Sequence, residues 1–156
     1  MPLIGVGIDT LEVARVAGLL DLYGDSFVER WFTPTEVDWC RERGHRPADF
    51  AAVLVGKEAV WKALRPQGTG PVPWRTLEVI PEGEAGRVMV PPELSRPGLE
   101  VIVSVGAVAE RVIASALAWT EGPGTVPHGA AVRAPSDQDP RNQIPCDQDS
   151  CDKGPA

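Results

Sequence analysis

The sequence predicts an α+β domain with an N-terminal strand, three helices and then antiparallel strands packed on a long central helix. Three observations support this fold class. LIGVGID at the N-terminus alternates apolar residues with glycine, as a buried strand does. The segment from Phe50 to Leu64 is almost wholly apolar and marks the long helix. After Trp74 the chain changes to short β-branched segments divided by turn residues.

The N-terminal strand is expected to end on Asp9, and a first helix follows directly in LEVARVAGLLDLY. Asp9 has two candidate roles there, the N-cap of that helix or a metal ligand. GVGIDT also resembles the start of a dinucleotide fingerprint, but Thr10 stands where the third glycine belongs, which excludes that site. The positions available for the inner face of the helix are Leu11, Val13, Val16, Leu19, Leu20 and Tyr23.

Two further helices have clear boundary signals. In TPTEVDWCRER, Thr33 as N-cap, Pro34 at the first helical position and Glu36 three residues after Thr33 form a capping box. Pro47 opens the long helix and Pro66 closes it. Four strands are expected in WRTLEVI, GRVMV, LEVIVSV and RVIASALAW.

One folded domain is expected at residues 1–120 and a disordered tail at 121–156. The tail is rich in Gly, Pro, Asp and Gln and nearly free of large apolar residues, so it cannot bury enough surface to offset its ordering entropy. The three cysteines show neither a disulfide framework nor zinc spacing, so we expect free thiols at Cys40, Cys146 and Cys151.

Composition excludes several classes of protein. The chain has 156 residues, of which 43% are hydrophobic and 24% charged, as in soluble globular proteins. A net charge of −7 argues against a nucleic-acid partner held mainly by phosphate contacts. No apolar run approaches the roughly 18 residues of a membrane-spanning helix. Residues 1–10 lack the basic start and cleavage site of a signal peptide, so a cytoplasmic protein is expected.

The long helix carries only three charged side chains after Phe50, namely Lys57, Glu58 and Lys62. Glu58 and Lys62 are four residues apart and share a face, while Lys57 lies about 100° to one side. One explanation is a surface salt bridge. However, Leu54 lies one turn before Glu58, so the charges interrupt an apolar helix and need partners. A cleft or subunit interface with an anionic ligand or a metal is the other explanation.

Four motifs resemble the holo-[acyl-carrier-protein] synthases, the small, trimeric class of 4'-phosphopantetheinyl transferases. They are GVGIDTLEVARV near the N-terminus, FTPTEVDWC, GKEAVWKAL, and the strand start at Trp74 with LEV after it. The likeness covers most of residues 3–118. Gly-Ile-Asp and Lys-Glu-Ala are specific as a pair at this separation.

The resemblance implies the phosphopantetheinyl transferase fold, a homotrimer, and transfer of 4'-phosphopantetheine from coenzyme A to a serine of an acyl, polyketide or peptide carrier protein. Asp9 and Glu58 would hold Mg²⁺, which prefers carboxylate and phosphate oxygens. Lys57, Lys62 and Gly68 would contact coenzyme A, with Lys62 neutralising phosphate charge and assisting the leaving group. Either Glu58 or a magnesium-bound water would serve as the base.

Three departures from the family pattern bear on activity. Gly106 and Ala107 occupy the positions of a Ser-His pair that helps to bind phosphate, and Val53 replaces an arginine that contacts the nucleotide. On the first helix only Arg15 matches the basic residues with which the family binds an acidic carrier protein. The acids that follow it would repel such a carrier. A basic cluster that either substitutes for these residues or is a solvated helix end consists of Arg41, Arg43 and Arg46.

Three functions remain open on this evidence. The first is a phosphopantetheinyl transferase for an unusual carrier domain in secondary metabolism. The second is a family member that uses the trimeric fold for another reaction on a carrier-bound or free substrate. The third is a non-catalytic scaffold. Retention of Asp9, Glu58 and Lys62 favours the first two, and loss of the Ser-His pair favours the last two.

Overall fold

The computed structural model describes residues 2–64, 72 and 74–121, which all belong to the first of the chain's two compact units, residues 1–125. Apart from Glu121, the predicted tail lies outside the described residues, so its disorder stays a prediction. In chain order the elements are β1 (Leu3–Glu12), α1 (Val13–Tyr23), α2 (Asp25–Trp31), α3 (Pro34–Glu42), α4 (Pro47–Leu64), β2 (Glu78–Ile80), β3 (Arg87–Met89), β4 (Leu99–Val108) and β5 (Arg111–Thr120).

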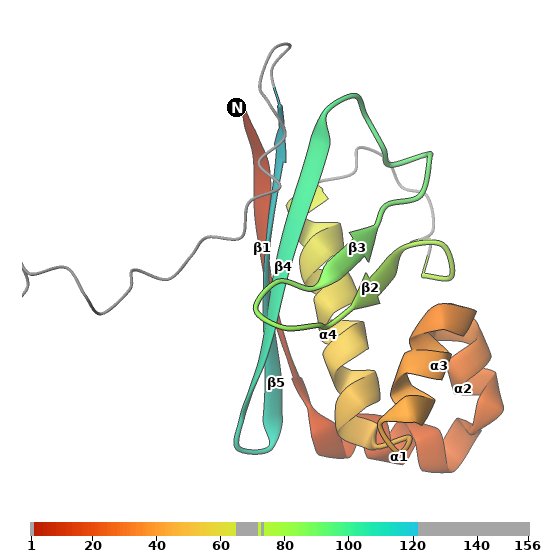
Figure 1. Cartoon of the computed structure of the whole chain (residues 1–156). Helices are drawn as coiled ribbons and strands as arrows, with labels where there is room; N and C mark the ends of the chain where they lie inside the picture. Colours follow the sequence, from red (N-terminus) through yellow and green to blue (C-terminus); the bar gives the residue numbers. More distant parts are fainter. Residues whose placement is uncertain (1, 65–71, 73, 122–156) are drawn as a thin grey trace, which may run out of the picture. The chain divides into compact units, whose positions relative to one another are not determined.

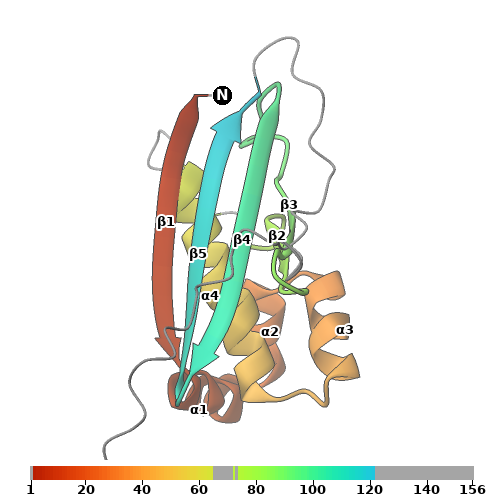
Figure 2. The same cartoon turned by 60° about the vertical axis from the view of Figure 1, so that its left-hand side comes forward.

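Strands β1, β5 and β4 form an antiparallel sheet in that order, and α4 lies lengthwise against one of its faces (Figures 1 and 2). Gly7 permits the close approach of the helix, since a Cβ on Gly7 would stand only 1.8 Å from the carbonyl oxygen of Ala59. Strands β2 and β3 form a separate two-stranded ribbon. A single bridge between Gly86 and Val103 joins this ribbon to β4.

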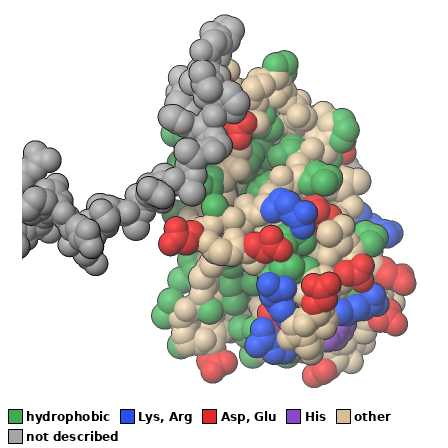
Figure 3. All heavy atoms as spheres, in the orientation of Figure 1, with side chains coloured by type: hydrophobic (Ala, Val, Ile, Leu, Met, Phe, Trp, Pro, Cys, Tyr) green, Lys and Arg blue, Asp and Glu red, His purple; other side chains and the backbone are tan. Residues whose placement is uncertain are grey.

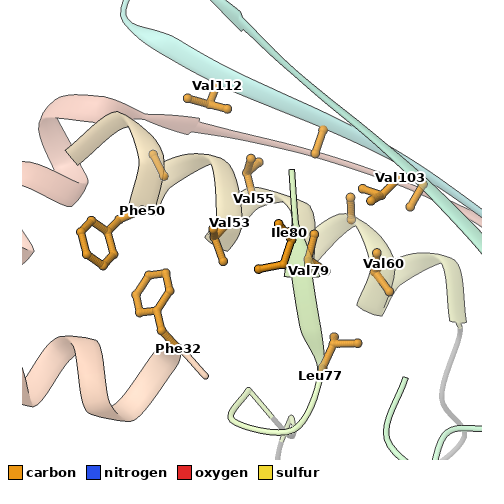
Figure 4. Close-up of a cluster of buried hydrophobic side chains, with 14 of the residues drawn as sticks. Phe32, Phe50, Val53, Val55, Val60, Leu77, Val79, Ile80, Val103 and Val112 are labelled. Atoms are coloured by element: carbon orange, nitrogen blue, oxygen red, sulfur yellow. The ribbon is translucent and has the colours of Figure 1, made fainter. Parts of the chain in front are cut away.

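The core is built around the buried faces of α4 (Figure 4). Phe50 at the start of α4 packs edge-to-face on Phe32, with ring centroids 5.1 Å apart. Further along α4, valine side chains pack against the sheet and the β2 ribbon. The fully buried members labelled in Figure 4 are Phe32, Phe50, Val53, Val55, Val60, Leu77, Val79, Ile80 and Val103.

The predicted start signals of α3 and α4 are confirmed, whereas Pro66, the predicted stop signal of α4, lies outside the described residues. Thr33 Oγ1 accepts a hydrogen bond from the Glu36 amide, and Glu36 Oε2 accepts one from the Thr33 amide, which is the predicted capping box. Helix α4 starts at Pro47. All four predicted C-terminal strands are present, although the first two are only three residues long each.

Two expectations about the N-terminal half were wrong. Residues 2–64 form four helices instead of the expected three, because DSFVERW folds as the short helix α2. Strand β1 does not end at Asp9 but continues to Glu12, since it pairs with β5 as far as the Glu12–Arg111 position. Asp9 therefore lies within the strand and is not the N-cap of α1, a position held by Glu12 without a side-chain cap.

The outer face of the sheet, which α4 does not cover, is unusually apolar. Five of its side chains are 40 to 61% exposed: Val6, Ile8, Ile102, Ile113 and Leu117. They alternate along their strands with residues that face α4, as the pleat requires. No helix in the described ranges has the length and apolarity needed to cross a bilayer.

Candidate functional site

A pocket of about 740 Å³ lies where α1 and α2 meet α4 and the C-terminal half of β1. Its lining combines charged residues from four elements with an apolar wall. Asp9 of β1 and Glu58 of α4 contribute carboxylates, while Arg15 of α1 and Arg30 of α2 contribute guanidinium groups. The apolar part of the lining includes Leu19, Trp31 and Leu54.

Asp9 and Lys62 are in direct contact beside this pocket. The Lys62 ammonium donates a hydrogen bond to Asp9 Oδ1 at 2.6 Å and another to the carbonyl oxygen of Ile8 at 3.2 Å. The side chains are 26% exposed for Asp9 and 46% for Lys62, so water and ligands can reach the pair. The strand β1 and the helix α4 thus bring together two of the residues that the sequence motifs single out.

Glu58 lies one helical turn before Lys62 and is half-buried in the pocket wall. Burial raises the pKa of its carboxyl group above the ordinary 4.5, and the negative charge of Asp9 raises it further, whereas Lys62 opposes both effects. The two carboxylates are therefore close enough for one to disfavour ionisation of the other. A cation bound between them would remove that repulsion.

The donor set fits Mg²⁺. Mg²⁺ commonly binds to proteins through one or two carboxylates and takes its other oxygens from phosphates and water. Asp9 and Glu58 supply two carboxylates on one pocket wall, and Lys62 occupies only one oxygen of Asp9. Within the described ranges there is no group of three or more His, Cys, Asp or Glu side chains that would form a self-sufficient protein cage.

The placement of Lys57 contradicts its expected contact with coenzyme A. Its side chain is fully buried, and its ammonium donates to Glu36 Oε2 at 2.6 Å and to the carbonyl oxygen of Trp31 at 2.9 Å. Helical geometry separates Lys57 from Glu58 by about 100°, and here that rotation turns Lys57 into the protein interior. Lys57 is therefore withdrawn from the binding residues. Gly68, the other expected coenzyme A contact, lies outside the described residues.

Arg15 and Arg30 are exposed and both line the pocket. The sequence motifs pointed to Arg15 only, as a contact for a carrier protein. Arg30 was missed because α2 was not predicted, and without that helix nothing relates Arg30 to Asp9. The i,i+4 spacing of Phe27 and Trp31, both in the pocket lining, is the signal that could have placed Arg30 beside them.

The residues that depart from the family pattern have distinct positions. Val53 is fully buried in α4 and contributes to the core. Gly106 and Ala107 are exposed near the end of β4, and neither is among the residues that line the pocket. A Cβ added to Gly106 would have no heavy atom within 4 Å, so the site has room for a larger side chain.

The basic cluster at the C-terminal end of α3 consists of locally paired side chains. Arg41 pairs with Asp38, Arg46 makes two hydrogen bonds to Asp49, and the Arg43 guanidinium stacks 3.9 Å above the Trp39 ring. Figure 3 shows basic and acidic side chains interleaved over the helical part of the surface. These contacts support the interpretation of a solvated helix end.

Solved structures with the same fold define the class of this protein. The holo-[acyl-carrier-protein] synthase from Neisseria meningitidis superposes with a TM-score of 0.64 at 23% identity, covering 76% of this chain and 99% of that one. The synthase from Chronobacterium ammoniagenes, solved as a coenzyme A complex, gives 0.63 at 24% identity, with 76% and 98% covered. The fold is therefore that of the holo-[acyl-carrier-protein] synthases.

Sequence comparison establishes the family. The model of the 4'-phosphopantetheinyl transferase superfamily matches residues 5–95. A holo-[acyl-carrier-protein] synthase of Chlamydia trachomatis is 35% identical over 119 residues, which cover 73% of this chain and 98% of that relative. The synthase of Koribacter versatilis is 38% identical over 77 residues, 49% of this chain and 62% of that relative. The chain belongs to the 4'-phosphopantetheinyl transferase superfamily.

Proposed function

We propose that this protein transfers 4'-phosphopantetheine from coenzyme A to a serine of a carrier protein, with Mg²⁺ held by Asp9 and Glu58. The observation that carries the proposal is the convergence of Asp9, Glu58 and Lys62 at one pocket. The relatives named above are synthases of holo-[acyl-carrier-protein], and one of the matching structures was solved with coenzyme A. An acyl carrier protein or a related carrier domain is therefore the partner.

In this reaction the serine oxygen of the carrier forms a bond to the β-phosphorus of coenzyme A. The bond between that phosphorus and the bridging oxygen breaks, and adenosine 3',5'-bisphosphate leaves with the electron pair. The bound Mg²⁺ would neutralise charge on the pyrophosphate. Asp9 of β1 and Glu58 of α4 would hold the ion, since both carboxylates line the pocket.

Glu58 and Lys62 have further roles in the chemistry. Glu58 would also accept the serine proton, since its carboxylate lies in the pocket wall. Its raised pKa is a property of the metal-free site, because a bound cation would lower it. Lys62 exchanges its contact with Asp9 for the phosphate oxygens, where it neutralises the charge that develops on the leaving group. Arg15 and Arg30 offer additional guanidinium contacts to the anionic substrate.

Calorimetric titration with coenzyme A, in the presence and absence of Mg²⁺, tests the site. Glu58→Gln should abolish the Mg²⁺-dependent part of the affinity, and Lys62→Met should weaken binding of coenzyme A about tenfold or more. Glu84→Gln is the matched control, since Glu84 is an exposed acid outside the pocket. Wild-type protein that binds coenzyme A equally with and without Mg²⁺ would count against the metal site.

A homotrimer is the second part of the proposal. The apolar outer face of the sheet supports it, because contiguous exposed apolar side chains mark an interaction surface. The number of three copies rests on the resemblance to the trimeric class of phosphopantetheinyl transferases. Leu117→Arg should give a monomer in sedimentation experiments, whereas Leu22→Arg should not, although Leu22 is 71% exposed on α1. A wild-type protein that sediments as a monomer at micromolar concentration would exclude the trimer.

Gly106 and Ala107 lack the side chains of the Ser-His pair that the family pattern has at these positions. This difference favours the alternative of another reaction on the same fold. A Cβ at Gly106 has open space and Ala107 is exposed, so Gly106→Ser with Ala107→His can supply the donors that the resemblance to the family implies. If this double change tightens coenzyme A binding, the substrate is shared with the family and only a contact is missing. If wild type transfers nothing and the double change gains neither affinity nor turnover, the alternative reaction is favoured.

A further inference from the structure

The interior of the molecule holds an ion pair that the proposed chemistry does not use. Lys57 of α4 and Glu36 of α3 are both fully buried, and their charged atoms are 2.6 Å apart. The pair is embedded in a polar network. Glu36 also accepts hydrogen bonds from the amides of Thr33 and Val79, each at 2.8 Å, and Lys57 donates to the carbonyl oxygen of Trp31 at 2.9 Å.

Overall stability does not explain such a pair. The attraction between two buried charges often fails to repay their loss of hydration, and well-packed apolar residues of similar volume are frequently as stable. Apolar side chains cannot, however, bind a main-chain carbonyl or amide. The network ties four segments together at defined atoms: the end of α2, the start of α3, the middle of α4 and strand β2.

The segment tied by Lys57 is a wall of the pocket. Trp31 is the last residue of α2 and lines the pocket together with Glu58. Its carbonyl oxygen lies at the end of a helix, where no further turn supplies an amide, and the Lys57 ammonium takes that place. The Trp31 ring packs on Trp74 with centroids 5.4 Å apart, so the side chain is supported from outside the helix as well.

We infer that Lys57 is a positioning residue for the pocket. Lys57 holds Trp31 at a fixed place relative to Glu58, which is the residue that follows Lys57 in the sequence. A single turn of α4 therefore carries Glu58, the proposed metal ligand, on one face. The adjacent face carries Lys57, which binds Trp31 in the pocket wall. This inference rests on the proposed transferase function.

Enzyme kinetics separate positioning from stability. Lys57→Met/Glu36→Gln removes both charges and the tether to Trp31. The single amide oxygen of Gln replaces only one of the two Glu36 oxygens that accept from Thr33 and Val79, and this loss is the same in Glu36→Gln alone. Glu36→Gln alone keeps the tether and is the matched control. The double variant should have a KM for coenzyme A or carrier raised about tenfold or more, because small displacements in a pocket have large kinetic effects. The control should keep the wild-type KM.

A merely structural role would lower the folded fraction, which scales the apparent kcat and leaves KM unchanged. The double variant should also show red-shifted tryptophan emission, and adding Trp31→Phe should remove the difference. If the double variant does not fold, Lys57→Gln is measured instead, because its amide is too short to reach both partners. Wild-type KM in a folded variant that lacks the tether overturns the inference, whereas inactive wild-type protein overturns the transferase function itself.

Discussion

Replacing Gly7 by alanine should damage stability and the site together. A Cβ at this position would lie 1.8 Å from the carbonyl oxygen of Ala59 and 2.8 Å from the amide nitrogen of Ala63. An ordinary contact begins at 3.4 Å, so strand and helix must separate by 1.6 Å. Both obstacles are backbone atoms of α4, which cannot rotate away as a side chain would.

The expected loss of unfolding free energy is about 3 kcal/mol or more, the upper end of the range for overpacked cores. The separation also exceeds what the 2.6 Å contact between Asp9 and Lys62 tolerates, because these residues lie on the same strand and helix. Coenzyme A binding in the presence of Mg²⁺ should therefore fall in any Gly7→Ala protein that still folds.

Urea denaturation at a fixed protein concentration measures the change, since stability of an oligomer depends on concentration. Gly18→Ala is the control, because Gly18 lies in α1 with no heavy atom within 4 Å of an added Cβ. It should stabilise by about 0.5 to 1 kcal/mol, as alanine does in a helix. A Gly7→Ala protein with wild-type stability and coenzyme A affinity would refute the reasoning.

Three further outcomes are expected. In metal-free protein, nuclear magnetic resonance of the Glu58 carboxyl carbon should show a titration midpoint above pH 4.5. Asp9→Asn should lower this midpoint, since the Asp9 charge is one cause of the raised pKa. An unchanged midpoint would show that the two carboxylates do not interact. In calorimetry without coenzyme A, Lys62→Met should bind Mg²⁺ about five- to tenfold more tightly, because the Lys62 ammonium competes with the ion for the Asp9 carboxylate. Weaker Mg²⁺ binding would mean that Lys62 does not compete with the ion. Burial raises the pKa of Cys40 to about 12, so iodoacetamide at pH 8 should alkylate Cys40 only when urea unfolds the protein. Equal alkylation rates with and without urea would contradict the burial of this thiol.

Local signals predicted the parts of the fold that depend on neighbours in sequence. Thr33, Pro34 and Glu36 formed the expected capping box because its atoms belong to one turn. The extent of β1 was not predictable in the same way. Pairing of Glu12 with Arg111 lengthens the strand, and these residues are far apart in the chain. Helix α2 was missed because seven residues with little periodicity are too few to show a pattern.

The candidate site shows the same division. Glu58 and Lys62 share a helical face, which follows from their spacing. In the structure Glu58 lines the pocket and Lys62 contacts Asp9 of the same lining. Spacing also separated Lys57 from them by about 100° but did not say which face would be covered. Packing of α3 and the end of α2 on α4 decides that, and it encloses Lys57 with Glu36. The charged side chains of this apolar helix therefore have two explanations. Lys57 belongs to a buried ion pair, and Glu58 and Lys62 belong to the candidate site.

Intact-mass analysis of apo carrier domains incubated with this protein, coenzyme A and Mg²⁺ tests the central claim most directly. We expect one phosphopantetheine to be added to the carrier serine, with the gain abolished by a chelator and by Glu58→Gln and preserved in Glu84→Gln. An absence of any mass gain across acidic and neutral carriers, or an equal gain with Glu58→Gln, would contradict the assignment of a metal-dependent transferase site to Asp9, Glu58 and Lys62.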